Sequence, residues 1–102
     1  PSVSDDVVIP HPNRLKGNYP NPFNPNTTIE FSIQNTGKIE LSIYNLRGQK
    51  VKSLVSDHLG SGLHKVVWNG EDDQGREVGS GIYLVHMQSS GYTMSKKITL
   101  IK

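Results

Sequence analysis

The chain has 102 residues, of which 33% are apolar, and its formal net charge at pH 7 is +2. This length accommodates a single domain, and the absence of cysteine excludes disulfides, zinc–thiolate sites and thiol catalysis. The eleven Lys and Arg residues are spread along the sequence, so we expect no nucleic-acid partner. No segment reaches the roughly 20 apolar residues of a membrane span, and residues 1–6 lack the features of a signal peptide.

The N-terminal segment is rich in proline, and the composition changes at Arg14. Residues 1–13 contain three prolines, which break regular structure, and only residues 7–9 could pair briefly as a strand. The sequence therefore predicts a linker over residues 1–13 and one folded domain over residues 14–102. A first strand is a candidate at residues 14–19.

From residue 27 onward, apolar and polar residues alternate along the chain. This pattern is typical of strands that have one buried and one solvated face. It predicts strands over residues 27–34 and 38–45, with three apolar side chains on the inner face of each. Because the short turn between them contains glycine, we expect these two strands to pair as a hairpin.

The remaining strands are predicted at residues 49–55, 63–69, 81–88 and 92–101, with loops at residues 57–62 and 70–81. Lys50 and Lys52 project from one face of the strand at residues 49–55, which suits the edge of a sheet. Trp68 and Tyr83 share faces with apolar residues and are expected in the core. Lys96 lies on the apolar face of the last strand, where its long stem could reach solvent. No helical pattern occurs, so we expect an all-β fold, an antiparallel sandwich of about seven strands.

The acidic residues and histidines of the chain do not have the spacing of a metal site or a catalytic site. Asp72, Asp73 and Glu77 match part of the spacing of a calcium loop, but a polar turn accounts for them better, and calcium stays a weak alternative. The four histidines lack the spacing of metal ligands, and no nucleophile elbow occurs. We therefore expect no catalytic residue, metal or cofactor. Tyr44, which has polar neighbours, is expected to be the best exposed aromatic, and a single exposed aromatic is a poor sugar platform.

Residues 18–25 read NYPNPFNP. Their prolines fix φ and restrict the preceding residues, which predicts a stiff extended segment with Phe23 as an apolar plug. This motif, followed by TTIEF at residues 27–31, resembles the start of the type A C-terminal sorting domains of the type IX secretion system. The resemblance continues through IYNLRGQKV at 43–51, GLHKVVWNG at 62–70, GSGIYLV at 79–85 and KKITLIK at 96–102.

The resemblance implies an Ig-like architecture, similar to the Ig-like domain of flagellar hook-capping proteins, and a role as an address tag rather than a catalyst. Such a domain directs a larger precursor from the periplasm across the outer membrane, to the cell surface or the medium. The implied partners are the secretion translocon, a sortase-like surface peptidase and a cargo domain upstream of residues 1–13 in the same chain. No small-molecule substrate is implied.

The resemblance also implies that the final strands carry most of the recognition. The positions that correspond are Gly81, Tyr83, Lys96, Lys97, Ile98, Leu100 and Lys102. The rigid N-terminal motif corresponds to Tyr19, Pro20, Asn21, Pro22 and Phe23. Alternation by itself accounts for Tyr83, Ile98 and Leu100 as core residues, whereas burial does not explain Lys97 and Lys102. Two other functions stay open on the sequence: an Ig-like structural or assembly module, and a carbohydrate-binding accessory domain.

Overall fold

The computed structural model describes residues 14–22, 26–89 and 91–101. Regular structure in these residues is entirely β. The strands are β1 (Arg14–Tyr19), β2 (Thr27–Ile33), β3 (Gly37–Asn45), β4 (Lys50–Leu59), β5 (Gly62–Trp68), β6 (Gly81–Ser89) and β7 (Tyr92–Leu100). Within this part of the chain, no helix is long and apolar enough to cross a membrane.

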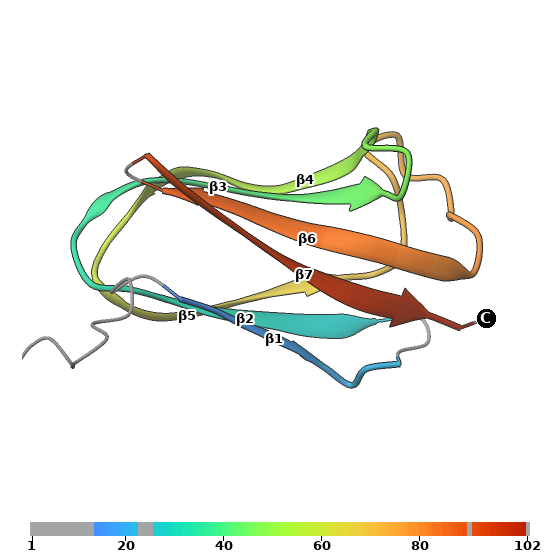
Figure 1. The fold of residues 1–102 in the computed structure, drawn as a ribbon, viewed down its shortest axis with the longest axis horizontal. Helices are drawn as coiled ribbons and strands as arrows, with labels where there is room; N and C mark the ends of the chain where they lie inside the picture. The colour runs from blue at the N-terminus through green and yellow to red at the C-terminus, as the bar shows by residue number, and fades with distance from the viewer. Residues whose placement is uncertain (1–13, 23–25, 90, 102) are drawn as a thin grey trace, which may run out of the picture.

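The seven strands form two layers (Figure 1). One sheet has three strands in the order β1-β2-β5, and the other has four in the order β4-β3-β6-β7. All neighbouring strands pair antiparallel. The predicted antiparallel sandwich of about seven strands, including the candidate strand at residues 14–19, is therefore confirmed.

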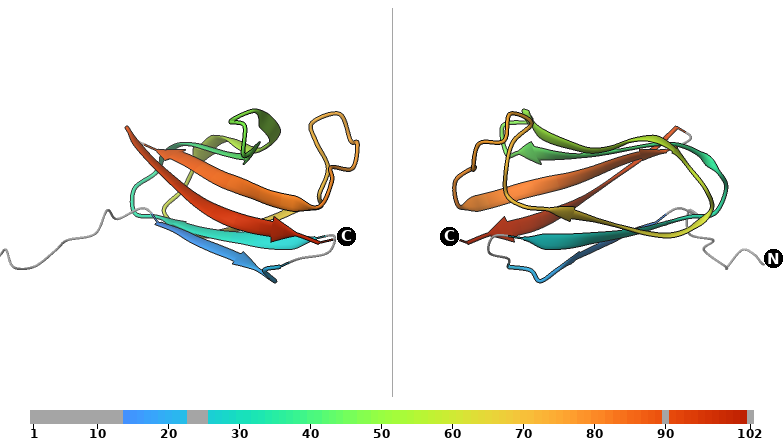
Figure 2. Two further views of the ribbon diagram at one scale, coloured as in Figure 1. Left: turned by 45° about the vertical axis from the view of Figure 1, so that its right-hand side comes forward. Right: turned by 180° about the vertical axis from the view of Figure 1, so that it is seen from behind.

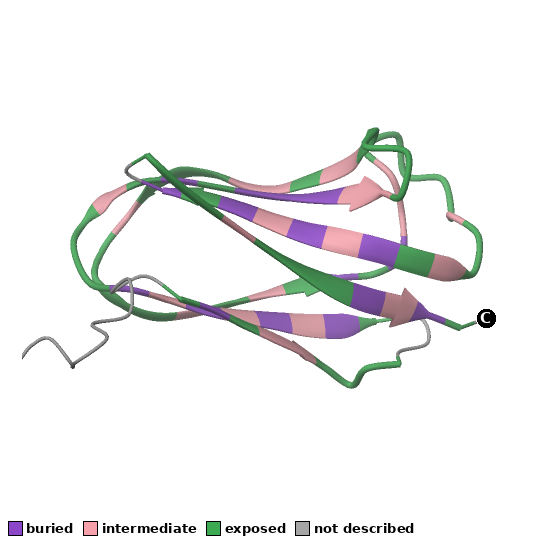
Figure 3. Ribbon diagram, viewed as in Figure 1, coloured by how far each residue is buried: buried purple, intermediate pink, exposed green. Residues whose placement is uncertain are grey.

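The core lies between the two sheets and consists of the residues that alternate inward along each strand (Figure 3). The pattern is clearest in β2, where Ile29, Phe31 and Ile33 are at most 3% exposed while the residues between them are half-buried. The buried apolar residues are Leu15, Ile29, Phe31, Ile33, Ile39, Leu41, Ile43, Trp68, Tyr83, Val85, Met87, Ile98 and Leu100. Burying each large side chain contributes roughly 1.5–3 kcal/mol, so this set holds the sandwich together without a disulfide.

The predicted hairpin between residues 27–34 and 38–45 is wrong. β2 lies in the three-stranded sheet and β3 in the four-stranded sheet, so their connection crosses from one layer to the other (Figure 2). An arch of this kind turns the apolar faces of both strands toward the same core, as a hairpin also would. Alternation in the sequence is identical in the two arrangements, and it cannot distinguish them.

The expected strand at residues 49–55 is longer in the structure, where β4 runs from Lys50 to Leu59. The expected loop at residues 57–62 is accordingly wrong, and only a short connection around Gly60 separates β4 from β5. The residues at the end of β4 are polar, so the sequence pattern predicts a loop there. An edge strand tolerates exposed polar side chains, and the strand continues. The expectation that Lys50 and Lys52 mark a sheet edge is confirmed, since β4 borders the four-stranded sheet.

Candidate functional site

The N-terminal motif and the C-terminal strand, at opposite ends of the sequence, meet at one end of the sandwich. The segment after β1 lies beside the end of β7 (Figure 1), and the Thr99 N–H donates to Asn21 Oδ1 at 3.0 Å. The backbone amide of Thr99 therefore points away from β6, toward the free edge of the sheet. Asn21 satisfies this amide where the next strand of a larger sheet would otherwise pair with it.

A small hydrogen-bond network holds the Asn21 segment in place. Asn18 Nδ2 donates to Thr27 Oγ1 at 2.9 Å and to the Pro20 carbonyl at 3.2 Å, and Thr27 Oγ1 donates to the same carbonyl at 2.9 Å. Thr27 is 1% exposed, so a buried hydroxyl anchors the bend to the start of β2.

The expected extended conformation of residues 18–25 holds for Asn18 and Tyr19, which end β1, but it is wrong for residues 20–22. Residues 20–22 form bends, and the peptide bonds Tyr19–Pro20 and Asn21–Pro22 are cis. The bend directs Asn21 toward β7, whereas a straight segment would continue away from it. Phe23, the expected apolar plug, lies outside the described residues.

The side chain of Lys96, in the four-stranded sheet, lies close to the three-stranded sheet on the side where β1 and β7 are neighbours. Its Cδ lies 3.9 Å from the position that a Cβ on Gly17 would occupy. Gly17 has φ +124° at an irregularity in the β1–β2 pairing, a conformation that glycine adopts without strain. The aliphatic stem of Lys96 thus approaches β1 at Gly17 while the residue stays exposed, as its position on the apolar face of the strand predicts.

Trp68 and Tyr83 fasten the long β5–β6 loop to the sandwich. Their rings meet edge to face with centroids 5.3 Å apart. The Tyr83 hydroxyl donates to the Gly79 carbonyl at 2.6 Å, and Trp68 Nε1 donates to the Glu71 carbonyl at 2.9 Å. Burial raises the pKa of the Tyr83 hydroxyl. This geometry is that of the tyrosine corner of Ig-like sandwiches, in which a tyrosine near the start of a strand bonds the backbone a few residues upstream.

Two acidic residues of the same loop, Asp72 and Asp73, accept backbone hydrogen bonds that stabilise a turn. Asp72 Oδ1 accepts the N–H groups of Gln74 and Arg76 at 2.9 Å each, and Asp73 Oδ1 accepts the Ser53 N–H of β4 at 3.0 Å. The backbone N–H of Arg76 is the main cause that lowers the pKa of Asp72, and it outweighs the opposing effect of desolvation. In the described part of the chain, no three His, Asp or Glu residues are grouped to hold a metal ion. The structure shows a polar turn at Asp72 and Asp73, and Glu77 takes part in a backbone bridge with Glu71.

An open hollow of about 430 Å³ lies beside this turn, between the β3–β4 turn and the β5–β6 loop. Its lining includes Lys50, Asp72 and Arg76, of which the last two form an ion pair at 3.4 Å. Two of the charged side chains in its lining, Asp72 and Arg76, are therefore already paired with each other.

Comparison with known families gives a match over residues 18–102 to the model described as the secretion system C-terminal sorting domain. The chain belongs to this family of sorting domains. The match runs from the Asn18 segment through β7, so it includes both partners of the Asn21–Thr99 hydrogen bond. It confirms the resemblance that the sequence motifs indicated. A search of curated protein sequences finds no significant match.

Two solved structures from Porphyromonas gingivalis share the fold of the sorting domain. Dimeric latent PorU matches with a TM-score of 0.67 and 21% identity, over 82% of this chain and 9% of PorU. PorZ, a surface component of the type IX secretion system, matches with a TM-score of 0.55 and 23% identity, over 83% of this chain and 11% of PorZ. The chain thus spans about a tenth of either protein, and the likeness concerns the fold.

The candidate recognition residues of the sorting domain fall into two groups in the structure. Tyr83, Ile98 and Leu100 are at most 8% exposed and belong to the core, as alternation predicts. Lys96 and Lys97 are exposed on β7, and Gly81 is half-buried at the start of β6. Lys102 lies outside the described residues. Two lysines of β7 are therefore the members of this set whose side chains a partner can reach in the described structure.

The aromatic residues that the structure describes are not arranged as a sugar-binding row. Tyr44 is half-buried and its ring packs edge-on against His86, with centroids 5.7 Å apart. The expectation that Tyr44 is the best exposed aromatic is wrong, since Tyr19 is 50% and Tyr92 54% exposed. These two lie at the end of β1 and the start of β7, at opposite ends of the sandwich (Figure 1).

Proposed function

We propose that this chain is the non-catalytic C-terminal sorting signal of a larger precursor, which it directs across the outer membrane by the type IX secretion system. The observation that carries the proposal is the family match over residues 18–102. It spans six complete strands and the N-terminal motif, so the signal corresponds to a folded sandwich rather than to a short linear peptide.

The proposal includes the route and the partners of the precursor. The cargo precedes residues 1–13, passes through the periplasm and reaches the cell surface or the medium. The translocon reads the folded domain, and a sortase-like surface peptidase then separates the cargo from it and attaches the cargo to the surface. Residues 1–13 serve as the linker in which or before which this cleavage takes place.

The recognition surface is proposed to include Lys96 and Lys97 of β7, with Lys102 beyond it. The neighbouring Ile98 and Leu100 are buried, so their proposed role is to hold β7 on the sandwich. The same applies to Tyr83, whose hydroxyl bonds the β5–β6 loop. Recognition by such a strand requires the fold, since only a folded strand presents both lysines in a fixed geometry.

The test is a fusion of the chain to the C-terminus of a reporter that carries its own periplasmic signal. The fusion is expressed in a cell with a type IX system and in an otherwise identical cell without its translocon. We expect the reporter outside the first cell only, and in the periplasm after deletion of residues 92–102. Because this deletion disturbs folding, the double variant Lys96→Glu/Lys97→Glu tests recognition on an intact sandwich. Export that is independent of the translocon, or unchanged by the deletion, would contradict the proposal.

A further inference from the structure

Four strands border the two sheets, and they differ in how much of their free edge is covered. β4 is bordered by Asp73, whose backbone N–H donates to the Val51 carbonyl at 3.0 Å and whose side chain accepts the Ser53 N–H. β1 is short and carries a pairing irregularity between Leu15 and Gly17. Such irregularities discourage the pairing of an edge with another chain.

Of the two border strands that pair without a register shift, β5 with seven residues and β7 with nine, β7 is the longer. Its nine residues pair with β6 without a register shift. Backbone amides alternate in direction along a strand, and the Thr99 amide points outward to Asn21. The amides of Thr93, Ser95 and Lys97 therefore also point away from β6. Asn21 covers the C-terminal end of this edge, and β7 diverges from β1 toward its own start (Figures 1 and 2).

Four cationic side chains lie on β7 and on the neighbouring strand β1. Arg14 and Lys16 of β1 and Lys96 and Lys97 of β7 are exposed, and none of the four forms an ion pair with another residue that the structure describes. Neither strand contains an acidic residue. Glu30, the acidic residue paired with β1, lies opposite Gly17 and is paired on its other side with Lys65.

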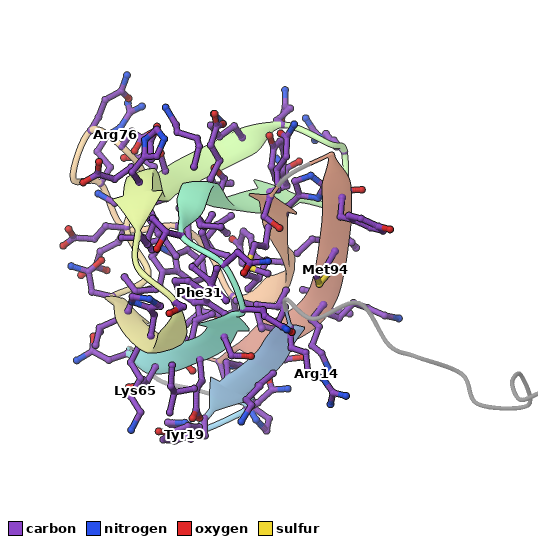
Figure 4. All side chains as sticks on the ribbon, turned by 90° about the vertical axis from the view of Figure 1, so that its left-hand side faces the viewer. Arg14, Tyr19, Phe31, Lys65, Arg76 and Met94 are labelled. Carbon is purple, nitrogen blue, oxygen red and sulfur yellow. The ribbon has the colours of Figure 1, made fainter. Side chains whose placement is uncertain are left out.

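The inner side of β7 offers apolar contact near its start. Met94 is half-buried and packs against the edge of the core, and Tyr92, two residues away on the same side, is 54% exposed. Figure 4 shows Met94 on the inner side of β7 and Arg14 on the same side of the sandwich. A strand laid beside Thr93–Lys97 would place alternate side chains next to Met94 and next to Lys97.

We infer that β7 is the docking strand of the sorting domain, to which an extended acidic segment of a partner protein adds as a further β-strand. The inference rests on the proposed function, and it specifies the chemistry of the partner. Outward amides of β7 bond the backbone of the segment, acidic side chains on one of its faces pair with Lys97, and apolar side chains on the other cover Met94 and Tyr92. Main-chain bonds supply affinity in this mode, and the alternate side chains supply specificity. The four cations steer the segment to the edge.

The binding test uses the whole chain, labelled with ¹⁵N, and two capped heptapeptides. One peptide alternates Glu with Val and the other alternates Lys with Val. We expect saturable shifts of the amide signals of residues 93–97 with the Glu peptide, and binding weaker by about tenfold or more with the Lys peptide.

The deciding variants are Ser95→Pro and Ser95→Ala. Both remove the hydroxyl that bonds His86 Nδ1, so they differ in the outward N–H, which proline lacks. Proline is tolerated at an edge position whose amide faces solvent, and circular dichroism verifies that both variants keep the β fold. We expect Ser95→Ala to bind the Glu peptide like the parent chain and Ser95→Pro to lose about tenfold or more in affinity. Equal binding by both variants, or a Glu peptide that leaves residues 93–97 unshifted, would overturn the inference. Equal binding of the Glu peptide by the two variants would mean that the cations bind its carboxylates without a backbone hydrogen bond to residue 95.

Export of the reporter fusion separates this inference from the proposed function. Failure of the parent fusion to leave the cell would refute the sorting role, while the peptide experiment would still decide whether β7 accepts a strand. If the parent and Ser95→Ala fusions are exported and the Ser95→Pro fusion stays in the periplasm, strand addition at β7 is part of sorting. Equal export of all three would refute that.

Discussion

At the scale of single residues, the most informative contact is the hydrogen bond between Asn21 and Thr99. It spans 78 positions in the sequence, and it connects the two ends of the family match. The contact gives Asn21 a structural role, since its side chain closes the edge of β7 where a backbone amide would otherwise lack a protein partner. The described part of the proline-rich motif therefore contacts the last strand of the domain.

We predict that Asn21→Ala lowers the free energy of unfolding by about 1 kcal/mol, the usual net value of one hydrogen bond. The measurement is urea unfolding, together with hydrogen exchange of the Thr99 amide, which should become faster. Asn21→Asp keeps a side-chain acceptor and should retain the protection of that amide. Asn26→Ala, at an exposed residue of the same connection, serves as the control. Unchanged exchange at Thr99 in Asn21→Ala would show that the contact does not persist in solution.

A second prediction concerns Asp72 and pH. The backbone N–H of Arg76, with smaller help from the Gln74 N–H and the Arg76 side chain, holds the pKa of Asp72 below its usual 3.8. A carboxylate with a lowered pKa in the folded state contributes stability above the unfolded value, and this contribution is lost as pH falls through the folded value. We expect the loss to begin near pH 4 and to continue below it. Asp72→Asn should flatten this part of the profile, measured as the urea midpoint between pH 2 and pH 6. A variant with the parent's slope would contradict the assignment.

At the scale of elements, β7 combines two roles along one strand. Its inward residues Ile98 and Leu100 are at most 1% exposed and complete the core, whereas Lys97 points into solvent. The family resemblance groups all of them as recognition residues, whereas alternation along the strand predicts that Ile98 and Leu100 are buried. The structure separates those that hold the strand from those that a partner can touch.

We predict that Ile98→Ala destabilises the domain by about 2–5 kcal/mol, through lost burial and the cavity it leaves. Lys97→Ala should change the free energy of unfolding by no more than about 0.5 kcal/mol, as for other exposed positions. Urea unfolding of the two variants measures the difference. If Ile98→Ala unfolds at the same urea concentration as the parent chain, β7 does not contribute to the core as the structure shows. If Ile98→Ala is destabilised as expected, a loss of its export is explained by unfolding and needs no contact with the translocon. A loss of export in Lys97→Ala would require such a contact.

The pattern of strands and turns in the sequence does not determine which consecutive strands pair with each other. The turn at residues 35–37 fits a hairpin in length and composition, yet β2 and β3 belong to different sheets. By contrast, β6 and β7, which are also joined by a short connection, do pair with each other. Local turn chemistry is similar in the two cases, so the difference arises from the layer in which each strand finds its partners.

At the scale of the whole molecule, the two sheets have their free edges on the same two sides, and these sides are unequal. On one side β4 is bordered by the β5–β6 loop through Asp73. On the other, Lys96 of β7 approaches β1 and Asn21 bonds Thr99, but no described strand pairs with the free edge of β7. This long open edge is the physical basis for the inference that a partner strand adds to β7.

The sequence by itself determined the strands, their inner and outer faces and the family, because the side-chain period of two is a local property that burial on one side enforces. It also identified the exposed lysines of β7 and the core positions of Trp68 and Tyr83. The tertiary structure alone decided the sheet to which each strand belongs, the contact of Asn21 with Thr99 and the continuation of β4 to Leu59. These features depend on groups that meet across long separations in the chain, and their free energies arise only once both layers have packed.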